Sequence, residues 1–242
     1  MDRNSTQYVL FFTMTMTVVV AVVLAGMYSS LKSIHTTNER NYNKKQILSS
    51  LNIAEEFKAE SMADGAVATM FSDQVTGVVI DAESKVTDAR EAQDIDMEKE
   101  EKKPEADRLY PVFKYTSAKT NKEYFILSVR GNGLWDKIWG WIAIENDADR
   151  TIAGAAFGHK GETPGLGAEI KDNTSWKNMF AGEKLYKKGE YSPVIVKKGG
   201  ADPTSKYEVD AISGATVTCD GVTKMLEKGL AVYMPYLDSV KK

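Results

Sequence analysis

A long apolar run near the amino terminus constrains this chain more than any other feature of its sequence. Residues 4–31 contain no formally charged side chain, and residues 8–27 are apolar apart from a few hydroxyl residues. About 20 such residues in a helix, rising about 1.5 Å each, cross a hydrocarbon core of about 30 Å. Threonine hydroxyls can bond helix carbonyls, so they do not prevent insertion. The run therefore predicts one transmembrane helix over residues 8–31, after a short tail, residues 1–7.

A cleaved signal peptide is the alternative interpretation of the same run. The run exceeds the usual signal core of about 7–15 residues, Arg3 is the only basic residue before it, and no Ala-x-Ala pattern precedes a plausible cleavage site. We therefore expect an uncleaved anchor in a lipid bilayer. The basic residues that follow the run favour the cytoplasmic side for the rest of the chain: Lys32, Arg40, Lys44 and Lys45.

The rest of the chain predicts a stalk and one folded domain. Residues 32–60 are polar with a few apolar residues at helical spacing, which is typical of a helical stalk. Residues 61–109 combine a short apolar segment with many charged residues, and the sequence assigns this helical, charged region no definite role. Residues 110–242 are expected to form the folded domain.

Apolar segments within these regions predict the strands of a sheet. Strands are expected at residues 78–80, 123–130, 139–145, 151–157 and 192–197. A short helix is expected over residues 175–180, and the last helix is expected to bury one apolar face: Val222, Met225, Leu226, Leu230 and Tyr233. Successive strands with helices beside them favour an α+β fold with a mainly antiparallel sheet and flanking helices.

Composition excludes several kinds of site. The net charge of −3 provides no net basic field to attract nucleic acid, so no nucleic-acid partner is expected. The single cysteine, Cys219, and two histidines, His35 and His159, argue against a metal or iron–sulfur site. Walker, Rossmann and nucleophile-elbow motifs are all missing from the sequence, so no catalytic residue is predicted.

The segment before the last helix carries the clearest binding signal. Asp210-Ala-Ile-Ser-Gly-Ala-Thr-Val-Thr218 offers small residues and hydroxyls where backbone amides can converge. We expect Thr218 at the helix start, where unpaired amides and the positive end of the helix dipole favour an anion. An ordinary N-cap is the alternative, but a cap alone does not require the preceding pattern. Residues 131–135 and 159–167 are also unusually rich in glycine.

These nine residues resemble the flavinylation motif of the FMN-binding domain family, D-x-x-[ST]-G-A-[ST]-x-T. The resemblance implies covalent FMN, moved from FAD by a flavin transferase onto the hydroxyl of Thr218 through a phosphoester bond. It implies that backbone amides hold the phosphate near Ser213, Gly214, Ala215 and Thr216. It places four residues beside the isoalloxazine ring: Glu162, Thr163, Gly165 and Leu166. Trp135 and His159 are either flavin contacts or structural residues.

Two groups of proteins share this motif. One is the NqrC family, from the sodium-translocating NADH:quinone oxidoreductases, and the other is the RnfG family, from the Rnf complexes. Residues 131–135 and the helical stalk resemble the first group, whereas residues 159–167 are similar in both. The first resemblance implies an electron-transfer subunit between an iron–sulfur centre and the next flavin, in a complex that couples NADH oxidation and ubiquinone reduction to sodium transport. A flavin-free, membrane-tethered scaffold is the alternative of a different class.

The resemblance also implies partners and a location. Expected partners within that complex are NqrB, NqrD and NqrE, and through them NqrA and NqrF, together with the flavin transferase during maturation and the lipid bilayer. Complete catalysis is not expected from this subunit alone, because its sequence has no visible nicotinamide site. Similar subunits place the flavin domain on the periplasmic side of the bacterial inner membrane. This opposes the count of basic residues, and we follow the resemblance in expecting a single-pass protein with a periplasmic flavin domain.

Overall fold

The computed structural model describes residues 5–55 and 58–240. The chain divides into two compact units, Met1–Tyr42 and Asn43–Lys242. Residues 1–4 of the predicted tail lie outside the described residues.

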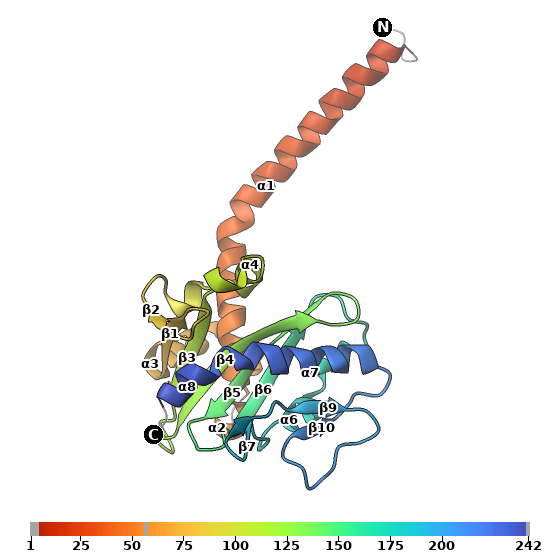
Figure 1. Ribbon diagram of the computed structural model, residues 1–242. Coiled ribbons are helices and arrows are strands. Elements are labelled where there is room, and N and C mark those ends of the chain that lie inside the picture. The colour runs from red at the N-terminus through yellow and green to blue at the C-terminus, as the bar shows by residue number, and fades with distance from the viewer. Residues whose placement is uncertain (1–4, 56–57, 241–242) are drawn as a thin grey trace. The chain divides into compact units, whose positions relative to one another are not determined.

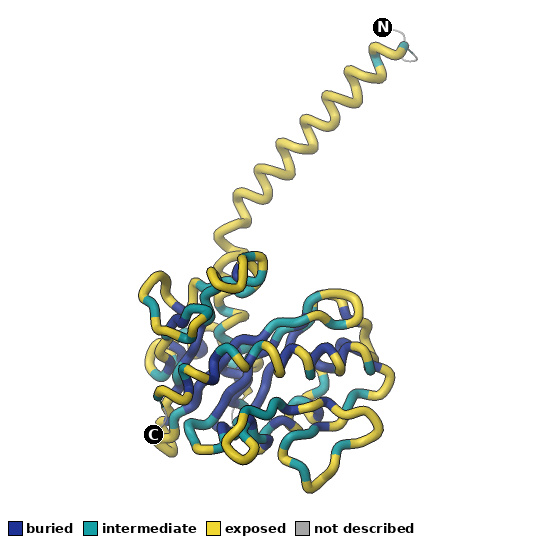
Figure 2. Tube along the Cα trace, viewed as in Figure 1, coloured by how far each residue is buried: buried dark blue, intermediate teal, exposed yellow. Residues whose placement is uncertain are grey.

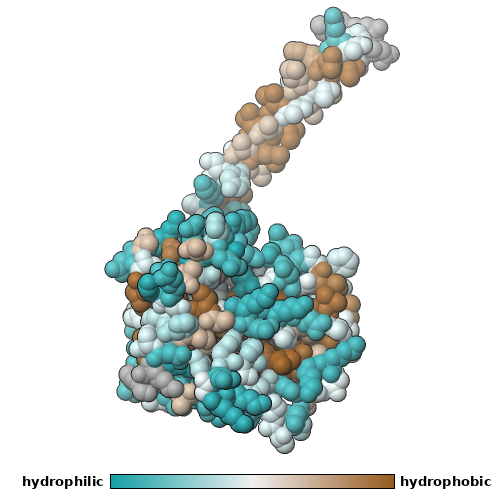
Figure 3. Space-filling view, in the orientation of Figure 1, coloured by the Kyte–Doolittle hydropathy of each residue, from teal (hydrophilic) through white to brown (hydrophobic). Residues whose placement is uncertain are grey.

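The first unit is the larger part of helix α1, Thr6–Ser49. Its apolar side chains are exposed, as Figure 3 shows, and the helix is long and apolar enough to cross a membrane. The hydroxyls of Thr13, Thr15 and Thr17 each donate to the carbonyl four residues earlier, at 2.8 Å, as expected. Length and composition therefore fit a membrane span, and they also fit a signal sequence near the amino terminus.

The second unit is built on an antiparallel sheet with the strand order β2-β1-β3-β4-β5-β6, drawn in Figure 1. Its strands are β1 (Val75–Ile80), β2 (Val86–Thr87), β3 (Tyr110–Thr116), β4 (Glu123–Asn132), β5 (Lys137–Glu145) and β6 (Ile152–His159). Two smaller sheets pair β9 (Ile195–Lys197) in parallel with β10 (Glu208–Asp210), and β7 (Tyr186–Lys187) with β8 (Glu190–Tyr191). The expected α+β fold with a mainly antiparallel sheet is confirmed.

Helices cover both faces of the sheet, so its central strands are buried on both sides (Figure 2). Successive side chains of a strand point to opposite faces. Phe125, Leu127 and Val129 of β4 therefore pack in one core with helix α7 (Thr216–Ala231), whereas Tyr124 and Ile126 pack in a second core with α3 (Asp64–Gln74). Burial on both faces explains why residues 124–127 of β4 are continuously apolar and do not alternate with polar residues.

All five residues of the predicted apolar face are at most 2% exposed, but α7 ends at Ala231, so it carries four of them and Tyr233 follows its end. Helix α7 approaches β4 closely where a glycine removes a side chain. A Cβ placed on Gly229 would lie 2.9 Å from Val129 Cγ1. The remaining helices are α2 (Asn52–Glu55), α4 (Met97–Glu101), α5 (Glu169–Asp172), α6 (Thr174–Asn178) and α8 (Met234–Ser239), with short 3-10 turns at Ala59–Ser61, Ala92–Asp94 and Glu105–Asp107.

The structure differs from three expectations about the organisation of the chain. The folded unit begins at Asn43 and not at residue 110, because β1 and β2 extend the sheet. The expected stalk, residues 32–60, ends inside this unit, where Leu48 and Leu51 are fully buried in the second core. The predicted strand at residues 192–197 lies outside the main sheet, because β9 pairs with β10 instead.

Candidate functional site

The structure brings the segment before α7 against the loop that follows β6. Thr218 Oγ1 donates a hydrogen bond to Glu162 Oε2 at 2.6 Å, across 56 residues of sequence. Thr218 is 1% exposed and Glu162 is 4% exposed, so the pair lies under the surface. Leu166 lies over Gly214, since a Cβ on that glycine would come within 2.6 Å of Leu166 Cδ2. Residues expected to hold the phosphate and residues expected to line the ring therefore form one cluster.

The carboxylate of Glu162 is held by the loop between β4 and β5. Its Oε1 accepts a hydrogen bond from the backbone amide of Trp135 at 2.9 Å, and its own backbone amide donates to His159 Nδ1 at 3.2 Å. Burial acts to raise the pKa of Glu162, but hydrogen bonds from the Thr218 hydroxyl and from the amides of this loop outweigh it and leave the pKa below its usual value. Glu162 is thus an ionised acceptor at neutral pH.

Helix α7 begins at Thr216, so Thr218 is the third residue of the helix and not the residue at its start. Its N-cap is Ala215, which makes no side-chain capping hydrogen bond, and the first turn holds no acidic residue. The preceding Ser213 and Gly214 are exposed, and Gly214 has a φ of +77°, a left-handed conformation that glycine adopts readily. Unpaired amides and the positive dipole end make such a helix start suitable for an anion.

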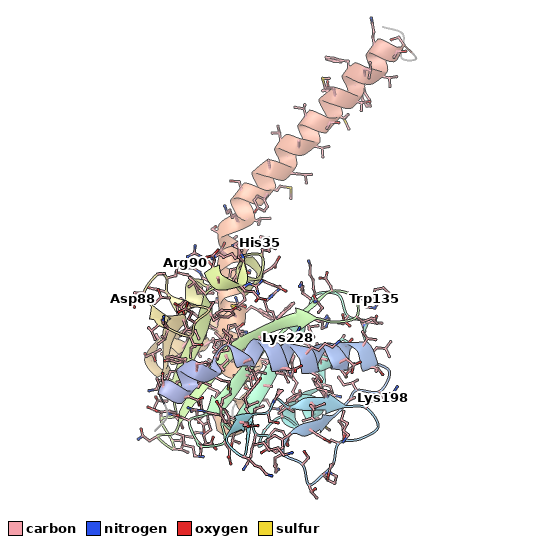
Figure 4. All side chains as sticks on the ribbon, in the orientation of Figure 1. His35, Asp88, Arg90, Trp135, Lys198 and Lys228 are labelled. Carbon is pink, nitrogen blue, oxygen red and sulfur yellow. The ribbon has the colours of Figure 1, made fainter. Side chains whose placement is uncertain are left out.

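Exposed apolar side chains lie around the buried pair on three segments. Trp135 is 69% exposed, which excludes the core role that its sequence left open, and its Nε1 donates to Thr163 Oγ1 at 3.2 Å. Figure 4 shows Trp135 at the end of the folded unit where α7 begins. The other exposed apolar residues of this group are Leu134, Leu166 and Val217. Together they offer an exposed apolar surface beside the start of α7.

Two glycines of the cluster allow the close contacts around Glu162. A Cβ on Gly133 would lie 2.5 Å from Glu162 Oε1, and a Cβ on Gly167 would lie 2.4 Å from Oε2 and 2.6 Å from Thr218 Oγ1. The sequence singled out both glycine-rich stretches but not these contacts, since nothing in the spacing relates residues so far apart. Cys219 has a structural contact, because its Sγ accepts a hydrogen bond from the amide of Ile212 at 3.3 Å.

Gly165 gives a stability prediction. Its φ of +74° lies in the left-handed region, which a β-branched residue adopts only at a cost of about 1–3 kcal/mol. We expect Gly165→Val to lower the free energy of unfolding by about that amount, measured by urea denaturation. The matched control is Gly161→Val, because Gly161 lies outside that region and an added Cβ would be an ordinary 3.8 Å from Asp136 Cβ. Equal losses for both variants would contradict the strain at Gly165.

Comparisons with known proteins agree on one family. A family model described as the FMN-binding domain matches residues 133–231, which include the whole cluster. The NqrC protein of the Na+-translocating NADH-quinone reductase of Pseudomonas aeruginosa is 31% identical over 93% of this chain and 91% of its own length. The corresponding protein of Vibrio anguillarum is 28% identical over 91% and 89%. The crystal structure of the Parabacteroides distasonis protein of the same name matches with a TM-score of 0.73 and 32% identity, over 86% of this chain and 96% of that one.

Proposed function

The chain belongs to the NqrC family of the Na+-translocating NADH-quinone reductases, and from this we propose that it carries FMN covalently on Thr218 through a phosphoester bond. The observation that carries the proposal is the buried Thr218 hydroxyl, 2.6 Å from the Glu162 carboxylate, in the first turn of a helix without a side-chain cap. A packed core does not require such a hydroxyl–carboxylate pair. A site at which a phosphate is attached does require a hydroxyl beside anion-binding amides.

The residues around Thr218 fit the two ends of FMN. In the proposed arrangement the amides near Ser213–Thr216 hold the phosphate, at the positive end of α7. The isoalloxazine ring lies beside Glu162, Thr163, Gly165 and Leu166, where Leu166 provides an apolar wall. FMN, when bound, accepts and releases electrons one at a time, while the protein orients the group and tunes its potential. Trp135 and Leu166 are exposed, which favours an isoalloxazine ring that stays accessible to a redox partner.

We further propose that this protein passes electrons from an iron–sulfur centre to the next flavin, within a complex that couples NADH oxidation and quinone reduction to sodium transport. NqrB, NqrD and NqrE are the proposed neighbours, with NqrA and NqrF reached through them, and a flavin transferase acts during maturation. Relatives that match over most of both chains favour this complex over the Rnf complexes. NADH oxidation is assigned to a partner protein of the complex.

Coexpression of the full chain with a flavin transferase tests the proposal. Protein purified in detergent and then denatured should keep its flavin fluorescence on a gel, and its intact mass should rise by the mass of FMN less one water. Protein made without the transferase is the control and should show neither signal. A protein that loses all flavin on denaturation would overturn the covalent proposal, and one that never binds flavin would favour the scaffold alternative.

The proposed topology has the apolar part of α1 as a single-pass inner-membrane span, with the domain that follows on the periplasmic side. Glu98 is exposed in helix α4, whereas the native Cys219 is buried. We expect Glu98→Cys to react with a membrane-impermeant maleimide in cells whose outer membrane alone is permeabilised, with the wild type as background control. Labelling that begins only after the inner membrane is opened would instead support the cytoplasmic side, which the basic residues favour.

A further inference from the structure

We propose that Glu162 is the general base for attachment of the cofactor, accepting the hydroxyl proton of Thr218 as its oxygen attacks the flavin-bearing phosphorus of a flavin dinucleotide. This inference rests on the proposed attachment at Thr218. The protein that receives the flavin would thus supply a catalytic group of its own, in addition to the catalytic groups of the transferase. The task belongs to the maturation step and not to electron transfer.

The geometry already matches that of a nucleophile paired with its base. The oxygens of Thr218 and Glu162 are 2.6 Å apart, inside the range of about 2.6–3.2 Å expected for such a pair. The other carboxylate oxygen accepts a hydrogen bond from the Trp135 amide, which fixes the orientation of the group. This is the arrangement of a nucleophile, a base and an orienting group. Within the part of the chain that the structure describes, Thr218 carries the one hydroxyl in the first turn of α7 that donates to a carboxylate.

The step balances in atoms and charge. A bond forms between Thr218 Oγ1 and the phosphorus of the flavin mononucleotide half, and the bond from that phosphorus to the bridging oxygen breaks. Adenosine monophosphate leaves with the bonding electron pair, and the hydroxyl proton passes to Glu162. No atom is oxidised or reduced. The carboxylate becomes neutral as a negatively charged phosphodiester arrives beside it, so the local charge of the site does not increase.

The loop at Gly167 shields the Thr218 hydroxyl, so it has to move before the dinucleotide can react. Because Thr218 is 1% exposed and Gly167 lies against its hydroxyl, a dinucleotide reaches Oγ1 only when this part of the loop moves aside. Residues 163–166 are exposed and the loop turns at Gly165, whereas Glu162 is fixed from both sides by Trp135 and His159. The distal part of the loop can therefore open while the base keeps its place.

The kinetics of attachment test this role. Full chain made without transferase is mixed in detergent with transferase and flavin adenine dinucleotide, and the intact mass is followed with time. General-base catalysis typically contributes about 10²–10⁴-fold, so Glu162→Gln should slow attachment by about that factor. Glu169→Gln is the matched control, because it removes the same charge from a residue of α5, a few residues further along, and should stay within about twofold of wild type. Thermal unfolding of each variant checks that it is folded.

The pH dependence of the attachment rate distinguishes a general base at Glu162 from a residue that only maintains the structure. When hydroxide must replace the base, the rate of Glu162→Gln relative to wild type should rise with pH, whereas a structural defect gives a ratio that does not change. Folded Glu162→Gln that reacts as fast as wild type, or a rate ratio that is flat with pH, would overturn the role of Glu162. Wild-type protein that gains no mass would instead overturn the attachment proposal itself, so the two failures are distinguishable.

Discussion

Thr218→Ala is expected to abolish the covalent flavin, because no other hydroxyl takes its place. The nearest alternative is Thr216, two residues earlier on the same helix, so its side chain points about 200° away around the helix axis. The variant also leaves the buried Glu162 carboxylate without one hydrogen-bond donor. This should lower the free energy of unfolding by about 1–3 kcal/mol. Intact mass after coexpression with a flavin transferase, together with urea denaturation, measures both effects.

Thr216→Ala is the matched control for this experiment. It removes an equivalent hydroxyl from the first turn of α7 but leaves the Thr218–Glu162 pair in place. We expect it to keep the added mass, with at most a reduced yield. Added mass that persists in Thr218→Ala and disappears in Thr216→Ala would move the attachment to Thr216.

Gly167→Val is expected to have the next largest effect. A Cβ at this position would lie within 2.6 Å of both Glu162 Oε2 and Thr218 Oγ1, closer than real Cβ atoms approach other atoms. The two side chains would have to separate, which breaks their hydrogen bond and leaves polar atoms buried without partners. We expect attachment to fall at least tenfold, in the time course of mass gain, and the free energy of unfolding to fall by about 1–3 kcal/mol.

The control for Gly167→Val is the same substitution at Gly161, in the same loop, where an added Cβ meets only ordinary contact distances. It should attach flavin at the wild-type rate. If Gly167→Val attaches flavin as fast as Gly161→Val while remaining folded, the close packing of Gly167 against the pair is not needed for the reaction.

Much of the fold was predictable because it depends on local pattern. The apolar runs of β4, β5 and β6 and the 3.6-residue periodicity of α7 each define an element without reference to the rest of the chain. Strand β3 was not predicted, because proline near the start of a segment argues against a strand, yet Pro111 pairs with Val79 in the structure. The burial of Leu48 and Leu51 was also missed, because a few apolar residues in a polar helix do not indicate which surface they cover.

The candidate site was predictable only as separate pieces. The motif ending at Thr218 and the loop from Glu162 to Gly167 could each be recognised, but their contact depends on how the sheet places the end of β6 beside the start of α7. The expected position of Thr218 at the helix start was wrong by two residues, because helix boundaries depend on backbone geometry that the sequence specifies weakly. The sequence likewise could not indicate that the Trp135 side chain is exposed at the surface.

The central claim, that Thr218 carries the flavin, is tested most directly by locating the added mass within one peptide. Trypsin should release residues 207–224, which contain both Thr216 and Thr218, from protein matured with the transferase. We expect this peptide to carry FMN less one water, and its fragmentation to place the group on Thr218. The same mass on Thr216, on Ser213 or on a different peptide would contradict the account.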